Sequence, residues 1–340
     1  MKVMRTRHTL AALLFALAVA TPAALSAQPR AQGRWVEGSV GEAQGARSYK
    51  LWVPARYTGR TRLPLVLMLH GCTQTADDFA RGTGMNAVAD ARRFLVVYPE
   101  QPKEANPLKC WNWFLPEHQS RGAGEPAMLA AIVRRVQSTH RVDARRVYVA
   151  GISAGGAMAS LVAAGYPELF AALGVSAGLE YRAAANVQEA LAAQKQGGPD
   201  PYRQGRLAYE AMKGVPGVTR RTRMPVIVFQ GTLDGAVATV NADQVISQWA
   251  QTNDLLDDDA DNESMDDTPE GAGAGVRVNA YDYSWGVYRD RRGRPLMEKW
   301  LVKGMRHAWS GGSASGTFTD PKGPDASAEM WRFFSGYRRQ

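Results

Sequence analysis

The sequence predicts an α/β fold in which helices cover both faces of a mostly parallel sheet. Apolar stretches alternate along the chain with segments that have the composition of helices. Residues 63–69 and 224–229 are continuous apolar runs, as expected of strands that are buried on both faces of a parallel sheet. The chain has 340 residues, 45% of them apolar, which is enough for one large hydrophobic core.

The expected elements follow one another in an order typical of a parallel sheet, because strands alternate with helices. We expect strands at residues 47–53, 63–69, 94–98, 146–150, 173–176, 224–229, 277–283 and 297–302. We expect helices at residues 75–92, 126–140, 154–165, 242–251 and 326–334. Helical pieces between residues 183 and 221 are expected to form a cap segment over a site.

Residues 1–27 are predicted to be a secretory signal peptide. A basic start is followed by an apolar run over residues 10–20 and by small residues up to Ala27. The run is too short to cross a bilayer comfortably as a helix, so a retained membrane anchor is the less favoured alternative. We therefore expect a secreted or periplasmic protein with no stable membrane association and one folded domain over residues 28–340.

The positive charge of the chain does not predict a nucleic-acid partner. The formal net charge is +9, and three of the bases lie in the predicted signal peptide. The arginine pairs at 134–135, 145–146, 220–221 and 291–292 are scattered and belong to no nucleic-acid-binding motif. This distribution favours solvated helix ends and loops over a nucleic-acid-binding face. The oligomeric state does not follow from the sequence.

The chain contains two cysteines, Cys72 and Cys110. In an oxidising compartment an even pair predicts a disulfide, whereas two buried free thiols are the alternative. The bond would close a loop of about 38 residues and contribute roughly 3–4 kcal/mol on the chain-entropy model. No pair of histidines lies at ligand spacing beside the cysteines, which argues against a zinc site. We expect neither a metal nor an organic cofactor.

Residues 253–275 form an acidic segment that contains nine acids and no base and ends in Gly-Ala-Gly-Ala-Gly. Three aspartates that begin at Asp257 have the spacing of a calcium-binding loop. That template fails because Asn262 and Thr268 stand where it requires Gly and Glu. We therefore expect a solvated acidic surface loop.

Gly-Ile-Ser-Ala-Gly at residues 151–155 matches the G-x-S-x-G nucleophile elbow, with Ser153 at its tip. In this motif a strand turns sharply into a helix, and small neighbours prevent backbone clashes. The pentapeptide alone is a weak signal in a chain with 34 glycines. Its context is stronger, because a strand at 147–150 precedes it and a helix at 156–165 follows. Ser153 is therefore predicted to be the nucleophile of an α/β-hydrolase fold.

A serine hydroxyl needs a base, and His307 is the predicted one because it follows the last strand. His70 precedes Gly71 at a strand end, where backbone groups usually matter more than the ring. His140 ends a helix away from Ser153, and His118 in an irregular loop is a reserve candidate.

Asp234, which follows the strand at 224–229, is the predicted acid. The chain order Ser153, Asp234, His307 is that of the α/β-hydrolase triad. Asp234 would hold the imidazole tautomer and stabilise its charged form, whereas a turn-forming aspartate is the alternative.

An oxyanion hole requires backbone donors at two places. We expect them to be the N–H groups of Ala154, after the nucleophile, and of Cys72, in the loop after strand 63–69. A bond from Cys72 to Cys110 would also hold that loop in place. Three tryptophans flank these positions in sequence, and we expect them to line or stack on the substrate, with core packing as the competing interpretation. They are Trp111, Trp113 and Trp309.

Seven separated blocks of this sequence resemble the poly(3-hydroxybutyrate) depolymerase-type esterases, in the order found in that family. The blocks are LMLHGCTQTADDFARGTGMNAVAD, VVYPEQ, CWNWF, AGISAGGAM, QGTLDGAV, GMRHAWSGG and FTDPKGPDASAEMWRFF. The resemblance spans residues 47–334 and implies an α/β-hydrolase that attacks ester carbonyls. It implies a triad and two oxyanion donors at the positions named above. Feruloyl and acetyl-xylan esterases share much of this pattern.

The expected function is that of a secreted serine esterase that acts through an acyl-enzyme on poly(3-hydroxybutyrate)-type polyester or its oligomers. A feruloyl or acetyl-xylan carbohydrate esterase is the alternative within enzymes. A non-catalytic binding protein with the hydrolase fold is the alternative from another class, although all three triad positions are filled. Depolymerases that attack crystalline polymer usually append a binding domain. Because this chain ends at Gln340, we expect oligomers, amorphous polymer or short acyl esters as substrates.

Overall fold

The computed structural model describes residue 1 and residues 32–41, 45–219, 222–276 and 278–339. The predicted signal peptide therefore lies, apart from Met1, outside the described residues. Contacts divide the chain into residues 1–31 and 32–340, and the fold below is that of the second part. None of its described helices is long and apolar enough to cross a membrane.

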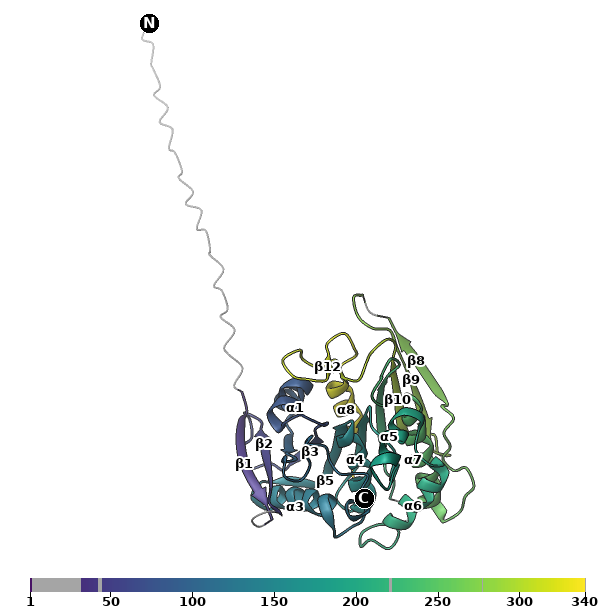
Figure 1. The fold of residues 1–340 in the computed structure, drawn as a ribbon. Coiled ribbons are helices and arrows are strands. Elements are labelled where there is room, and N and C mark those ends of the chain that lie inside the picture. The colour runs from purple at the N-terminus through teal and green to yellow at the C-terminus, as the bar shows by residue number, and fades with distance from the viewer. Residues whose placement is uncertain (2–31, 42–44, 220–221, 277, 340) are drawn as a thin grey trace. The chain divides into compact units, whose positions relative to one another are not determined.

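Within the described residues, ten strands form one sheet (Figure 1). Their bounds are Arg34–Val40 (β1), Arg47–Val53 (β2), Leu63–Leu69 (β3), Leu95–Pro99 (β4), Val142–Ile152 (β5), Ala172–Ser176 (β6), Val226–Gly231 (β7), Gly271–Gly275 (β8), Tyr283–Arg289 (β9) and Pro295–Val302 (β10). The order across the sheet is β1-β2-β4-β3-β5-β6-β7-β10-β9-β8. The six central strands β4, β3, β5, β6, β7 and β10 pair in parallel. The outer strands β1 and β2 on one side and β9 and β8 on the other pair antiparallel.

Helices cover both faces of this sheet, as the sequence predicts. Their bounds are Ala76–Thr83 (α1), Met85–Arg92 (α2), Gly124–Thr139 (α3), Ala154–Gly165 (α4), Val187–Gln196 (α5), Pro201–Met212 (α6), Val240–Asp258 (α7) and Ala326–Ser335 (α8). A short 3-10 helix spans Pro116–His118, and Trp309–Ser310 (β11) pairs with Thr319–Asp320 (β12) outside the main sheet.

The hydrophobic core has two layers because side chains of the buried strands alternate between the faces of the sheet. In β3, Leu65 and Leu67 belong to the layer under α3, α4, α6 and α7, whereas Val66 and Met68 belong to the layer under α1, α2 and α8. The mostly parallel, doubly covered sheet confirms the predicted fold class. It also places the carboxyl ends of β3, β5, β7 and β10 along one edge, where sites of such sheets form.

Two predicted elements differ from the structure. The predicted helix at 75–92 is two helices, because Gly84 takes a left-handed conformation (φ 65°) that ends α1. The predicted strand at 277–283 is wrong, since β9 begins only at Tyr283. Asn279 has a φ of 58°, which an extended strand does not allow.

The predicted acidic loop at 253–275 is wrong at both ends. Its first residues continue α7, because the buried Asn253 side chain exchanges hydrogen bonds with the backbone N–H and C=O of Met224 (2.8 and 2.9 Å). Its last five residues form edge strand β8, which pairs with β9. A side chain at Gly273 would collide with the indole of Trp285, so this glycine-rich sequence suits a strand covered by large rings.

Helices α5 and α6 are the helical pieces predicted for the cap segment. α6 packs closely on α7, where a methyl group at Gly205 would lie 2.6 Å from the Gln248 carbonyl oxygen. The carboxyl end of α5 borders the loop after β7, since Ala238 N–H donates to Gln194 O at 2.7 Å. The predicted cap segment thus adjoins the loop that carries Asp234. That this segment covers a site stays a prediction.

Candidate active site

Ser153 lies on a strained turn between β5 and α4. Its backbone has φ 57° and ψ −125°, a region that non-glycine residues rarely adopt. A side chain at Gly155 would collide with the carbonyl oxygen of Leu69, so a small residue is required where α4 approaches the end of β3. The Ser153 N–H donates to Ser176 O in the neighbouring strand β6 at 3.0 Å. These contacts hold the half-buried serine at the tip of the turn.

The first residue of α4, Ala154, follows the serine directly. N–H groups of the first helical turn have no acceptor four residues earlier in the helix, and the positive end of the helix dipole lies there. The amino end of α4 is therefore suited to stabilise negative charge that develops beside Ser153.

Asp234 follows β7 with a buried carboxylate that has several hydrogen-bond donors. Its Oδ1 accepts from the N–H groups of Ala236 and Val237, both at 2.8 Å. Its Oδ2 accepts from Gln230 Nε2 at 3.2 Å and from His307 Nδ1 at 2.8 Å. Because an ionised carboxylate only accepts, this last contact places the hydrogen of a neutral His307 ring on Nδ1 and leaves Nε2 as the basic nitrogen.

The loops that carry Asp234 and His307 are joined along their backbones. Leu233 N–H donates to Met305 O and Thr232 N–H donates to Val302 O, both at 3.0 Å. These bonds continue the parallel pairing of β7 with β10 beyond the sheet. The acid and the base are thus positioned by one extended ladder.

Ser153, Asp234 and His307 follow the carboxyl ends of β5, β7 and β10, which lie close together in the sheet. The structure joins Asp234 to His307. Among the described residues it contains no hydrogen bond from the Ser153 hydroxyl to His307. Such bonds are often long in ligand-free enzymes and tighten only with substrate. Direct contact between Ser153 and His307 therefore stays a prediction.

The loop after β3 lies against Ser153. A methyl group at Gly71 would be 3.4 Å from the Cβ of Ser153. The predicted disulfide between Cys72 and Cys110 is present and anchors this loop. Thr73 N–H donates to Leu108 O at 2.6 Å, and Gly71 N–H donates to the Gln74 side chain at 2.9 Å. Cys72 lies between Gly71 and Thr73, whose N–H groups both have acceptors. Its own N–H is the group expected to bind the oxyanion.

A sequence model of the family described as esterase PHB depolymerase matches residues 47–270, more than half of the chain. The chain belongs to this family.

Proteins that are similar to this chain in sequence have differently named activities. Poly(3-hydroxyalkanoate) depolymerase C of Paucimonas lemoignei is 32% identical over 245 residues, which cover 72% of this chain and 54% of that protein. Feruloyl esterase B of Neurospora crassa is 31% identical and covers 56% of this chain. The chain spans 65% of that second relative's length, so it matches only part of both proteins. Acetylxylan esterase A of Emericella nidulans is 30% identical and covers 60% of this chain and 67% of its own length.

Two solved esterase structures share the fold of this chain. An acetyl xylan esterase from Aspergillus awamori superposes with a TM-score of 0.64 and 22% identity, over 80% of this chain and 94% of that one. A feruloyl esterase module from Clostridium thermocellum has a TM-score of 0.52 and 14% identity, over 81% and 82% of the two chains. These similarities confirm the α/β-hydrolase fold.

In this member of the esterase family, the three tryptophans expected to touch substrate are buried in the core. Trp111 and Trp309 have no exposed surface and Trp113 has 2%. Trp309 donates its indole N–H to Ser327 Oγ at 3.1 Å and meets the Phe79 ring edge-on. Because their faces are covered, the structure supports the packing interpretation of these tryptophans and not the predicted contact with substrate.

Two exposed apolar side chains stand beside the acid and the base instead. Phe318 is 45% exposed, and its ring centroid lies 6.0 Å from that of His307. Leu233 precedes Asp234 and is 65% exposed. Both residues lie in blocks that carry the family resemblance, QGTLDGAV and FTDPKGPDASAEMWRFF, but nothing in those blocks indicates which side chains contact substrate. Both are candidates to contact the apolar part of a substrate.

The remaining described histidines have structural partners. His118, the reserve candidate for the base, accepts the N–H of Glu125 at 3.0 Å and thereby caps α3. His140 contacts the hydroxyl of Thr139 at 3.0 Å at the other end of that helix. Neither ring lies next to a carboxylate and a nucleophile, so neither competes with His307.

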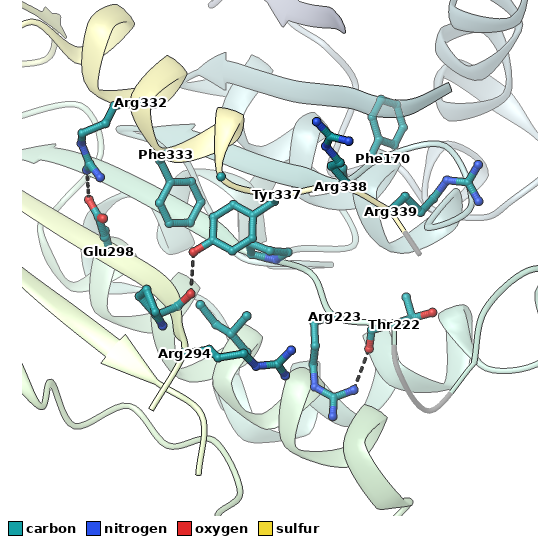
Figure 2. Close-up of a pocket in the computed structure, with 15 residues that line it drawn as sticks. Phe170, Thr222, Arg223, Arg294, Glu298, Arg332, Phe333, Tyr337, Arg338 and Arg339 are labelled. Atoms are coloured by element: carbon teal, nitrogen blue, oxygen red, sulfur yellow. Dashed lines mark hydrogen bonds and ion pairs between the residues drawn. The ribbon is translucent and has the colours of Figure 1, made fainter. Parts of the chain in front are cut away.

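A pocket of about 490 Å³ lies at the amino ends of the parallel strands, whereas the candidate active site lies at their carboxyl ends (Figure 2). Its lining includes Ala171 and Pro225, which directly precede β6 and β7. Arginines surround it, and Figure 2 shows one of them, Arg332, paired with Glu298. The pocket lies at the amino ends of the strands, so it is separate from the candidate active site.

Proposed function

We propose that this chain is a serine esterase that hydrolyses carboxylic esters through an acyl-enzyme on Ser153. The observation that carries the proposal is the 2.8 Å hydrogen bond between Asp234 and His307, at the sheet edge where Ser153 occupies a strained elbow. Membership of an esterase family supports the same reaction. A binding protein without activity has no need for this strained, partnered set of side chains.

The proposed reaction has two steps. His307 Nε2 takes the hydroxyl proton while Ser153 Oγ attacks the ester carbonyl, and Asp234 stabilises the resulting imidazolium. The N–H groups of Ala154 and Cys72 stabilise the oxyanion, and His307 then returns the proton to the departing alcohol. In the second step His307 takes a proton from water, which attacks the acyl-enzyme. His307 then returns the proton to Ser153 Oγ as the acid is released.

The proposed substrates are poly(3-hydroxybutyrate)-type polyesters or their oligomers. The similarity to a poly(3-hydroxyalkanoate) depolymerase supports this class, because that protein covers the largest share of this chain among the three sequence relatives described above. The exposed side chains of Phe318 and Leu233 beside the base provide apolar contacts for an aliphatic ester. Feruloyl or acetylated xylan esters are the second candidates, supported by the similar esterases of plant polymers.

The test compares initial rates of purified protein on a hydroxybutyrate oligomer, methyl ferulate and acetylated xylan. We expect the oligomer to have the highest kcat/KM. The matched control Ser153→Ala should lose about 10⁶-fold in kcat on whichever ester is cleaved. A higher kcat/KM for methyl ferulate or acetylated xylan would establish the second candidate. Absence of hydrolysis of all three esters would contradict the proposed esterase.

We also propose that the protein is exported and that residues 1–27 are removed. The Cys72–Cys110 disulfide supports this location, because disulfides persist in oxidising compartments. The mass of the protein recovered from the periplasm or medium should correspond to a chain that begins near Gln28. A retained amino terminus would contradict this proposal.

A further inference from the structure

The imidazole of His70 is fully buried behind the loop that follows β3. Its Nε2 lies 3.1 Å from the backbone N–H of Gln101, which can only donate. Nε2 is therefore an acceptor, and the hydrogen of the neutral ring is on Nδ1. Nδ1 lies 2.7 Å from the carbonyl oxygen of Gly71 and donates to it. Two backbone groups thus select one tautomer of one ring.

This ring controls the direction of the peptide group that carries the Cys72 N–H. In a planar trans peptide the C=O and the N–H lie in one plane and point in opposite directions, so the direction of the Gly71 carbonyl fixes that of the Cys72 N–H. Because His70 holds the carbonyl toward the buried ring, the Cys72 N–H is directed away from the core. The same peptide adjoins Ser153, since a methyl group at Gly71 would lie 3.4 Å from the serine Cβ.

The preceding peptide group is held as well. Gly71 N–H donates to Gln74 Oε1 at 2.9 Å. The amide nitrogen of Gln74 donates in turn to Thr317 O at 3.0 Å. On the opposite side, Gln101 donates from its side chain to Cys110 O at 2.9 Å, next to the disulfide. Both peptides that flank Gly71 are therefore fixed, one by the imidazole and one by an amide.

A purely apolar residue at position 70 would not replace the ring. It would fill the space beside the Trp111 indole, whose centroid lies 5.5 Å from that of the imidazole. It would leave the Gly71 carbonyl and the Gln101 N–H buried without these partners, which is unfavourable. The Gly71 carbonyl would then keep only the long hydrogen bond from the Gln74 N–H (3.4 Å), and the Gly71–Cys72 peptide would be held less firmly.

We infer that His70 is a positioning residue that aligns the Cys72 N–H with the oxyanion through its hydrogen bond to the Gly71 carbonyl. The inference rests on the proposed function, because it assigns His70 a role in that reaction. Burial lowers the pKa of His70 to about 4, so the ring is neutral at physiological pH. His70 contacts the reacting atoms only through the peptide and is not itself the base.

Two substitutions separate the donor of His70 from its acceptor. In His70→Asn the side-chain amide nitrogen can take the place of Nδ1 and donate to Gly71 O. In His70→Gln the terminal oxygen reaches the place of Nε2 and accepts from Gln101, whereas the Gly71 contact is lost. Each variant keeps one of the two hydrogen bonds of His70. If His70 only stabilised the fold, the two variants should therefore have similar activities.

We expect kcat of His70→Gln to fall about 100-fold, the lower range for loss of one oxyanion donor, and that of His70→Asn to stay within about tenfold of wild type. KM should change little in both. Binding of a trifluoromethyl ketone, which forms a tetrahedral oxyanion on the serine, should weaken with kcat in His70→Gln. Equal kcat values and equal ketone affinities in the two variants would overturn the inference.

Wild-type protein provides a test that does not depend on the folding of variants. ¹⁵N NMR of histidine-labelled enzyme should show His70 as the neutral Nδ1–H tautomer from pH 5 to 8. An Nε2–H tautomer would overturn the inference. Failure of the proposed function is distinguishable, because wild-type protein would then neither hydrolyse esters nor react with the ketone.

Discussion

Two loops that follow the carboxyl ends of sheet strands, β3 and β10, each carry a histidine, and the surroundings of the two rings differ. His307 has a side chain that is 14% exposed, and its Nδ1 donates to the carboxylate of Asp234. His70 is fully buried, and both of its nitrogens bind backbone groups. A carboxylate partner and an accessible second nitrogen suit a ring that must gain and lose a proton. Two backbone partners suit a ring that keeps one tautomer and orients a peptide.

Loss of the Asp234 carboxylate should have the largest effect on the reaction. Asp234→Asn should lower kcat by about 10⁴-fold, because an amide in place of the carboxylate favours the wrong tautomer of His307. Steady-state kinetics on the best ester measures the effect. Asp243→Asn, which alters an exposed ion pair with Lys299, is the matched control and should keep wild-type kcat. A loss below tenfold in Asp234→Asn would show that His307 acts without this carboxylate.

The disulfide distinguishes the two loops by stability. It ties the His70 loop to Cys110 across 38 residues, whereas the His307 loop is held by hydrogen bonds and by the packing of the buried Met305 and Ala308. Reduction should lower the free energy of unfolding by roughly 3–4 kcal/mol through the added freedom of the unfolded chain. Thermal unfolding with and without reductant measures this change, and Cys72→Ser/Cys110→Ser should unfold like the reduced protein. An unchanged melting temperature together with two titratable thiols after reduction would contradict the prediction.

Burial of His70 should make the stability of the protein depend on pH. Burial lowers the pKa of His70 to about 4 in the folded protein, against 6.5 for an exposed histidine. Between these pH values the unfolded chain binds the proton and the folded protein does not, so stability falls as the pH falls from 6.5 to 4. The loss attributable to His70 should be on the order of 3 kcal/mol. Urea unfolding of wild type and His70→Asn measures it, and identical pH slopes for the two proteins would contradict it.

Features encoded by short local patterns were predictable from the sequence. The elbow at Ser153 needs small residues within one turn, and those residues are adjacent in the chain. The continuous apolar runs marked the buried parallel strands, and the chain order indicated Asp234 and His307. The structure joins these last two by a hydrogen bond, although they are 73 residues apart.

Features that depend on distant neighbours were not predictable. Trp111 and Trp309 are near the site in sequence, but tertiary packing covers their faces. Asn253 looked like the start of a loop, and only its bonds to Met224 explain why α7 continues through it. His70 was set aside because its neighbours suggested a backbone role. The structure shows that the ring itself holds the backbone.

The central claim is that Ser153 is a nucleophile activated by the pair formed by His307 and Asp234. Peptide mass spectrometry after reaction of the wild-type protein with a fluorophosphonate tests it most directly. We predict a single adduct on the peptide that contains Ser153, and a rate of labelling that falls by more than 10³-fold in His307→Asn. An adduct on another serine, or unchanged labelling in that variant, would contradict the claim.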